Sequence, residues 1–267
     1  MNNEVEIMDE IKKIDIIRIK GESILEEEDI IVSEFPFTIF VNGEELITLL
    51  CSPKSLKYLT VGFLYSEGFI SSARDIVNIK IDEGKGLSYV ELKNKSSLIE
   101  KLYGKRTITS GCGKGTLFYN VLDSFKSKKI NNELTITLDE IRTLVKAFSK
   151  NSELFLSTGG VHSCALCSTS DILIFEEDIG RHNALDKVLG NALVEDMMLT
   201  DKILLVSGRI SSEMLIKTAK REIPILVSRA APTSLAVELA RELNITLIGF
   251  ARGEKMNIYS NFPSLNF

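Results

Sequence analysis

The sequence predicts an α/β protein, α+β overall, with a smaller N-terminal domain rich in β-hairpins and a C-terminal domain built on a mostly parallel sheet with helices on both faces. Asn42-Gly43 lies between β-branched and apolar runs, which is the strongest short-range signal for a hairpin. In the second half of the chain, strand-like and helix-like segments alternate, and the strand-like segments are continuous apolar runs typical of parallel strands covered on both faces. We place the smaller N-terminal domain over residues 1–130 and the C-terminal α/β domain over residues 131–267.

The N-terminal half is expected to combine hairpins with one helix. Pro53 opens a helical pattern whose apolar stripe includes Leu56, Leu59 and Phe63 and which closes near Gly68. The other predicted elements are a strand over 14–20, a hairpin over 37–50 and a second hairpin over 76–93 that turns at Gly84 and Gly86.

The C-terminal half is expected to alternate strands and helices. Thr137 precedes an apolar-periodic run, and Glu140 completes a capping box, so a helix is predicted over about 137–149. Short connections between the later segments favour right-handed strand–helix–strand units. These segments are, in order, strand 171–176, helix 181–195, strand 202–206, helix 211–221, strand 224–228, helix 233–244 and a last strand over 246–250.

The composition narrows the class of protein. Of 267 residues, 44% are hydrophobic and 26% charged, enough for a sizeable core and against disorder. The net charge of −5 does not suggest nucleic-acid binding, and no apolar run approaches the roughly 18 residues that a membrane span needs. The N-terminus is too acidic and polar for a signal peptide, so we expect a cytoplasmic protein whose four cysteines are thiols rather than disulfides.

Arginines follow four of the predicted strands, where an open parallel sheet binds its ligands. Residues 201–267 carry a net charge of +3 although the whole chain is acidic. Arginine holds phosphate in a bidentate fork, so the pattern predicts a site for a small anion such as a pyrophosphate. The alternative is that these arginines pair with Glu176, Glu177, Asp178 and Asp186. The candidate anion-binding residues are Arg181, His182, Arg209, Arg229 and Arg252.

The absence of a Gly-rich P-loop and of a G-x-G-x-x-G motif argues against hydrolysable ATP and against NAD. His182, at a predicted helix start, could donate to a phosphate or act as a general acid, and it could equally be a packing histidine.

Cys112 is the candidate reactive thiol. It lies in a loop over 104–116, with glycine on both sides and with Arg106 and Lys114 nearby. Glycines leave the sulfur accessible, and positive charge increases the thiolate fraction, which is only a few per cent for an ordinary cysteine at pH 7. The alternative is a loop cysteine without a role, which this polar, glycine-rich setting does not favour.

The remaining cysteines have plainer interpretations. Cys164 and Cys167 form a C-x-x-C just after His162, and the three could be zinc ligands. The same segment is short and apolar, so two buried thiols could also pack there. No H-x-E motif accompanies His162, as a zinc deaminase would need, and we predict no metal site. Cys51, at the end of a hairpin strand, is assigned to the core.

Several long segments resemble the family of formate dehydrogenase accessory sulfurtransferases. The string EDIGRHNALDK is unusual enough to make the resemblance specific, and the similarity runs from about residue 30 to residue 260. The matching segments are 34–46, 59–70, 157–162, 177–187, 207–214, 223–240 and 247–260.

This resemblance implies a sulfur carrier. A cysteine desulfurase would place a sulfur on Cys112 as a persulfide, and the sulfur would pass to the molybdenum of a bis-molybdopterin guanine dinucleotide cofactor destined for the formate dehydrogenase apoenzyme. The resemblance also implies a cytidine-deaminase-like fold for the larger domain and a homodimer. It assigns cofactor binding to Phe250, Ala251, Arg252, Gly253, Glu254 and Lys255.

One departure from the family pattern leaves alternatives open. Family members often carry a second cysteine three residues after the first, where this chain has Gly115. Transfer through one cysteine remains chemically sound, because a persulfide needs only one carrier. A cofactor-binding chaperone without sulfur chemistry is the second hypothesis, and a zinc enzyme of the deaminase type is the third.

Overall fold

The computed structural model describes residues 9–93, 129–131, 133–261 and 265–266. The described elements are, in chain order, β1 (Ile11–Lys20), β2 (Ser23–Val32), β3 (Phe35–Val41), β4 (Glu44–Cys51), α1 (Leu56–Ser66), the short 3₁₀ helix η1 (Ala73–Asp75), β5 (Ile76–Asp82), β6 (Leu87–Leu92), β7 (Ile136–Thr137), α4 (Leu138–Asn151), α5 (Glu153–Thr158), β8 (His162–Cys167), β9 (Ile172–Asp178), α6 (Arg181–Val194), β10 (Ile203–Val206), α7 (Ser212–Ala219), β11 (Ile225–Ser228), α8 (Ser234–Glu242), β12 (Thr246–Arg252), β13 (Lys255–Ser260) and β14 (Leu265–Asn266).

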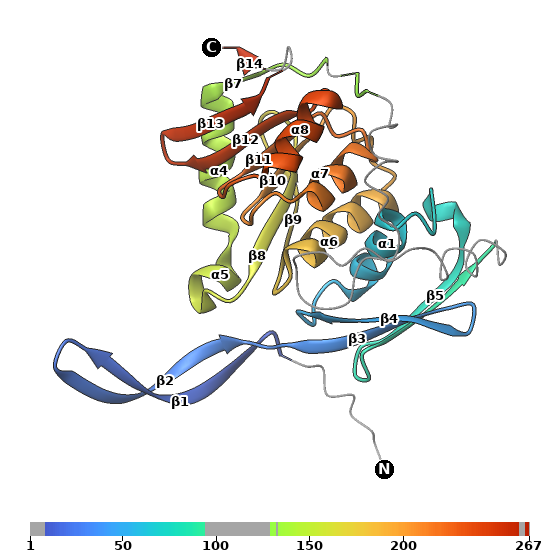
Figure 1. Cartoon of the computed structure of the whole chain (residues 1–267). Coiled ribbons are helices and arrows are strands. Elements are labelled where there is room, and N and C mark those ends of the chain that lie inside the picture. The colour runs from blue at the N-terminus through green and yellow to red at the C-terminus, as the bar shows by residue number, and fades with distance from the viewer. Residues whose placement is uncertain (1–8, 94–128, 132, 262–264, 267) are drawn as a thin grey trace.

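The N-terminal half forms a four-stranded sheet in the order β4-β3-β6-β5, with α1 packed against it (Figure 1). Both predicted hairpins and the predicted helix are confirmed. Asn42 and Gly43 have φ values of 52° and 88°, the left-handed backbone that a two-residue hairpin turn needs. The Asn42 side chain also accepts a hydrogen bond from the backbone N–H of Leu92 at 2.9 Å, which links this turn to β6.

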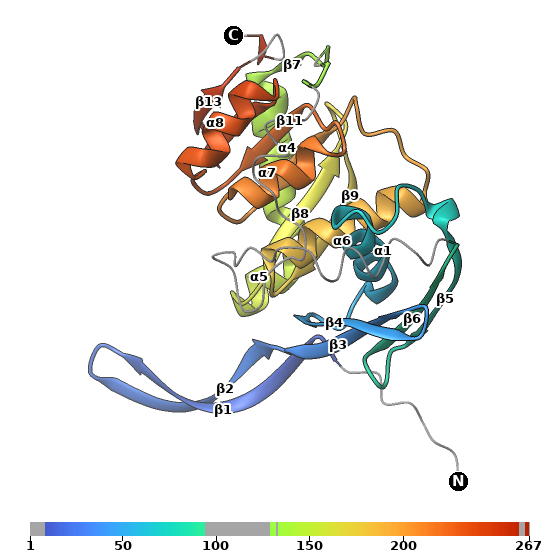
Figure 2. The same cartoon turned by 45° about the vertical axis from the view of Figure 1, so that its right-hand side comes forward.

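A long antiparallel hairpin, β1–β2, projects from the body of the molecule (Figures 1 and 2). The predicted strand over 14–20 lies within β1, but its pairing with β2 was not predicted. Large apolar side chains on this hairpin face solvent: Ile17, Ile19 and Ile24 are 66%, 69% and 71% exposed. Exposed apolar surface of this kind marks a candidate interaction surface.

The C-terminal half is built on a six-stranded sheet in the order β13-β12-β11-β10-β8-β9. The three central strands, β10, β11 and β12, are parallel and joined by α7 and α8, as predicted. The expectation of a mostly parallel sheet needs correction at both sides, because β8, β9 and β13 add by antiparallel pairing. The segment over 246–250 is likewise not the last strand, since a tight turn at Gly253 leads into β13.

Helices cover both faces of this sheet, as predicted. The ribbons of α6, α7 and α8 lie on one face and that of α4 on the other (Figures 1 and 2). The side chains of these two sets of helices pack with alternate residues of the strands. The predicted capping box of α4 is present, with Glu140 N–H donating to Thr137 Oγ1 at 3.2 Å and Thr137 N–H donating to Glu140 at 2.7 Å. No helix in the described part of the chain is long and apolar enough to cross a membrane.

The two halves share a close helix contact between α1 and α6. A Cβ atom added to Gly62 would lie 1.7 Å from the backbone oxygen of Asp186, and one added to Gly190 would lie 2.0 Å from the backbone oxygen of Tyr58. Glycine is therefore required at both positions for the helix backbones to touch. This contact fixes the N-terminal layer against the helix that follows β9.

Candidate functional site

A pocket of about 390 Å³ opens beyond the carboxyl ends of the central strands. Ser207, Arg229 and Arg252 come from the ends of β10, β11 and β12, and His162 begins the antiparallel neighbour β8. Ligands of open α/β sheets bind at this edge. The lining residues are Phe155, Gly159, Gly160, Val161, His162, Ser207, Arg229 and Arg252.

The two pocket arginines are fixed in relation to each other by the backbone. Arg252 Nε donates to the backbone oxygen of Arg229 at 2.8 Å, so one N–H of its guanidinium is held while the others stay available. Neither side chain forms an ion pair within the described residues. Two guanidinium groups in one pocket make a site suited to an anion with several oxygens, such as a diphosphate.

The end of β12 has an irregular backbone. The pairing register shifts between Gly249 and Arg252, and Phe250 lies in the left-handed region with a φ of 52°. The Phe250 N–H donates to the backbone oxygen of Ala230 at 3.1 Å, and Phe250, near the end of β12, is 43% exposed. A non-glycine residue held in this region is strained, and such strain is common at binding sites.

The other residues of the predicted cofactor stretch lie apart from the pocket lining. The Ala251 side chain is buried in the core between the sheet and α4. Glu254 Oε2 pairs with Arg142 Nε at 3.2 Å, and Gly253 and Lys255 are exposed at the turn. Their assignment to cofactor binding stays a prediction.

Arg181 lies next to His162 at the pocket edge. A Cβ atom added to Gly208 would lie 3.2 Å from His162 Nδ1 and 3.3 Å from Arg181 Cβ, so the glycine leaves room for both side chains. Burial and the Arg181 charge lower the pKa of His162. His162 is therefore a neutral imidazole at neutral pH.

The structure places His182 and Arg209 outside the pocket lining. His182 Nε2 lies 3.4 Å from Glu213 Oε2, and burial together with Lys217 and Arg181 lowers the pKa of His182 to about 3. A neutral, largely buried histidine fits the packing interpretation better than that of a phosphate ligand. Arg209 is exposed on the loop after β10.

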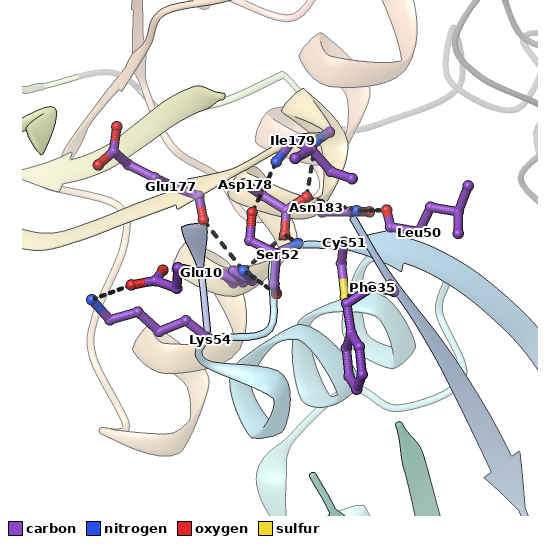
Figure 3. A network of polar contacts seen from close by, with 12 residues as sticks. Glu10, Phe35, Leu50, Cys51, Ser52, Lys54, Glu177, Asp178, Ile179 and Asn183 are labelled. Carbon is purple, nitrogen blue, oxygen red and sulfur yellow. Dashed lines mark hydrogen bonds and ion pairs between the residues drawn. The ribbon is translucent and has the colours of Figure 1, made fainter. Parts of the chain in front are cut away.

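Two of the acids that offered an alternative for the arginines, Asp178 and Asp186, form ion pairs with lysines. Asp178 and Lys187 form an ion pair at 2.7 Å, with both side chains fully buried. Asp178 also accepts from the backbone N–H groups of Ser52 at 3.0 Å and Gly180 at 2.8 Å and from Asn183 Nδ2 at 2.9 Å. Figure 3 shows this network joining β4 to the end of β9. Much of the EDIGRHNALDK segment therefore ties the two halves together.

A second buried network lies between α1, α6 and α7. Lys217 Nζ contacts both oxygens of Asp186, at 3.0 and 2.9 Å, and Glu67 Oε1 at 3.3 Å. Burial acts to lower the pKa of Lys217, but Asp186, Glu67 and Glu213 together raise it. Ser66 Oγ donates to Asp186 at 2.6 Å. Asp186 therefore pairs with the charge of Lys217 and, through Ser66, also links α6 to α1.

Three cysteines are buried, and two of them lie on opposite faces of the sheet. Cys164 packs with the core under α6, and Cys167 packs with the core under α4. Two side chains on opposite faces cannot bind one zinc ion, so the geometry does not support the zinc-enzyme alternative. Burial raises the pKa of Cys51 and of Cys167 to about 12 and that of Cys164 well above its usual value.

Cys112 and its loop over 104–116 lie outside the described residues. Of the pocket lining, the strand-end pattern in the sequence predicted Arg229 and Arg252 but not His162, Ser207 or the Gly159-Gly160 segment. The sequence signal for Ser207 is its position directly after the apolar run of β10. The signal for His162 is that it begins an apolar run, because a strand antiparallel to β10 brings its first residue to the same edge of the sheet.

The fold and pocket define a class: a mixed α/β protein with a pocket lined by two arginines at the carboxyl ends of its parallel strands. Residues 32–265 match the FdhD/NarQ family, and the chain therefore belongs to it. This confirms the resemblance inferred from the sequence segments.

Relatives of this chain extend the match over nearly its full length. A protein of Bacillus pumilus is 48% identical over 233 residues, covering 87% of this chain and 89% of its own. A protein of Listeria monocytogenes serovar 1/2a is 44% identical over 260 residues, covering 97% of this chain and all of its own. Both are named "Sulfur carrier protein FdhD".

A solved structure confirms the fold. A Desulfotalea psychrophila protein, assigned as a formate dehydrogenase accessory protein, superposes with a TM-score of 0.76 at 24% identity. The match covers 95% of this chain and 98% of that one.

Proposed function

We propose that this protein is a sulfurtransferase for formate dehydrogenase maturation, with Cys112 as its sulfur carrier. It takes sulfur from a cysteine desulfurase and passes it to the molybdenum of a bis-molybdopterin guanine dinucleotide, before that cofactor enters the formate dehydrogenase apoenzyme. The names of its relatives, "Sulfur carrier protein FdhD", support this assignment. The observation that carries it is the burial of the other cysteines.

The chain has four cysteines, and three of them are buried in the described structure. At a pKa of about 12, roughly one thiol in 100,000 is ionised at pH 7, against a few per cent for an ordinary cysteine. Only the thiolate attacks another sulfur. Cys112, with Arg106 and Lys114 beside it in the sequence, is therefore the one cysteine suited to carry sulfur.

The loading step conserves electrons. The Cys112 thiolate attacks the terminal sulfur of the desulfurase persulfide, the donor S–S bond breaks, and the donor cysteine leaves as a thiolate. Delivery of that sulfur as sulfide then requires two electrons. Because residue 115 is glycine, no cysteine three residues away supplies them, and we assign them to an external thiol that ends in a mixed disulfide with Cys112.

The pocket lined by Arg229 and Arg252 is the proposed binding site for the nucleotide part of the guanine dinucleotide cofactor. Arg229 and Arg252 line it together, and Arg181 lies at its edge beside His162. Each charge-assisted contact contributes about 1.5–3 kcal/mol, so two or three would hold a diphosphate. A pocket of about 390 Å³ matches a nucleotide rather than the entire cofactor.

We also propose that the protein is a cytoplasmic homodimer in which the β1–β2 hairpin contacts the second copy. A two-stranded hairpin is marginally stable alone, and β1–β2 presents Ile17, Ile19 and Ile24 on one face, which a second copy would cover. Light scattering after gel filtration should show a dimer that Ile17→Lys with Ile19→Lys converts to a monomer. Glu26→Gln, on the same face, should leave the dimer intact.

The test of function is sulfur loading. The reduced protein is treated with a cysteine desulfurase and cysteine, and its intact and peptide masses are measured. One added sulfur on the Cys112 peptide is expected, and Cys112→Ala should lose both the mass gain and transfer while keeping nucleotide binding. Sulfur on Cys164 or Cys167, or no gain at all, would contradict the proposal and favour the cofactor-binding chaperone.

A further inference from the structure

His162 and Ser207 are in contact in the pocket, and the proposed role of the arginines does not involve either residue. Ser207 Oγ lies 3.4 Å from His162 Nδ1, at the mouth of the pocket that both residues line. The serine is itself fixed, because the backbone N–H of Ser163 donates to its Oγ at 2.9 Å and its own N–H donates to the Ser163 oxygen at 3.0 Å. The start of β8 and the end of β10 thus hold the hydroxyl beside the imidazole.

This contact is compatible with a His162 ring whose Nδ1 accepts a hydrogen bond. Ser207 Oγ accepts from the Ser163 N–H, and its own hydroxyl proton can be donated to His162 Nδ1. A histidine whose Nδ1 accepts carries its proton on Nε2. Within the described residues, no hydrogen bond engages Nε2 of His162. In that tautomer, the ring of this pocket-lining residue carries one N–H donor, at Nε2.

Neighbouring groups keep this donor neutral. Partial burial of the His162 ring and the Arg181 charge beside it both disfavour the imidazolium form of His162. The Ser163 hydroxyl does not compete for the ring, because it bonds Ser152 Oγ at 2.9 Å and Glu177 Oε1 at 3.2 Å. A neutral Nε2–H between cationic side chains is suited to an oxygen that the arginines have drawn into the pocket.

We propose that His162, set in its Nε2–H tautomer by Ser207, is a ligand-binding residue that donates a hydrogen bond to a diphosphate oxygen of a nucleoside diphosphate. This inference rests on the proposed function in one respect, since the guanine dinucleotide of the cargo contains that diphosphate. Arg229 and Arg252 supply charge, and His162 supplies a directed neutral contact.

Calorimetric titration with guanosine diphosphate tests the contact. A hydrogen bond to a charged group implies that His162→Ala binds roughly 10-fold to 100-fold more weakly. His162→Gln places an amide N–H near the Nε2 position and should recover binding to within about 5-fold of the native protein, whereas His162→Asn should not. Inorganic pyrophosphate should show the same ratios, because the proposed contact is to phosphate.

A spectroscopic readout separates this role from simple packing. The chain has only two histidines, so ¹⁵N-histidine spectra contain two sets of ring signals. The His162 set should show a neutral ring protonated at Nε2, and Ser207→Ala should mix the tautomers without unfolding the protein. A dominant Nδ1–H form in the native protein would overturn the proposal.

The outcomes are distinguishable. If native protein binds neither guanosine diphosphate nor pyrophosphate, both the anion pocket and this inference fail. If native protein binds both and His162→Ala binds equally well, the inference alone fails. A loss for guanosine diphosphate without a loss for pyrophosphate would move the contact from the phosphate to the base and overturn the assignment made here.

Discussion

Asp178→Ala should destabilise the protein strongly, because it leaves a buried lysine without its counter-charge. Lys187 Nζ lies 2.7 Å from Asp178, with neither side chain exposed, and its other partners are the backbone oxygens of Ser52 and Glu177 at 3.3 and 3.2 Å. Breaking a buried pair from one side costs about 3–5 kcal/mol. The substitution also removes the acceptor of the Ser52 N–H.

The free energy of unfolding is measured by urea titration followed by circular dichroism. A loss of about 3–5 kcal/mol corresponds to a fall in Tm of roughly 6–20 °C for a chain of this size. Glu28→Ala is the matched control, since Glu28 Oε1 pairs with Lys13 Nζ at 2.8 Å but both side chains are more than half exposed. That change should cost no more than about 1 kcal/mol.

Removing both buried charges separates electrostatics from packing. Adding Lys187→Met to Asp178→Ala should recover part of the loss, because the uncompensated charge disappears. A cost below about 1 kcal/mol for Asp178→Ala, or full additivity of the two changes, would refute the reasoning.

The structure predicts further outcomes. A disulfide reagent should titrate one fast thiol in the native protein and four in denaturant, and two fast native thiols would contradict the burial of the other three. Gly62→Ala should cost about 1–3 kcal/mol or more, because its Cβ would meet the Asp186 oxygen; exposed Lys57→Ala on the same helix should be nearly neutral in urea unfolding. His182 has a folded pKa of about 3, below its unfolded value of about 6.5, so its stabilising effect is complete above pH 6.5. That effect should fade by about 1 kcal/mol per unit as the pH falls from 6.5 toward 3, and Tm against pH should be flatter for His182→Gln; an equal slope would count against the buried neutral state.

Local patterns predicted most elements of the fold. The hairpin signal at Asn42, the capping box at Thr137 and the apolar runs of the central strands all depend on neighbours in sequence, and the structure confirms them. The direction of the outer strands could not be predicted in this way. Pairing of β8, β9 and β13 depends on which edge remains open once the parallel centre is complete.

The pocket was predictable in part for the same reason. Arg229 and Arg252 follow strands of one direction, so the strand-end rule groups them. The strand-end rule did not include His162, because β8 runs antiparallel to β10 and its first residue, not its last, lies at that edge. Ion pairs of distant residues, such as Asp186 with Lys217, carry no local signal at all.

The burial of three cysteines also limits how native molecules can become covalently linked. With Cys51, Cys164 and Cys167 inside the core, each folded chain can contribute at most one thiol to bonds with other molecules. Air oxidation of the folded protein should therefore stop at linked pairs instead of growing into polymers. The same property makes the unaltered chain suitable for attaching a single dye, spin label or cross-linker.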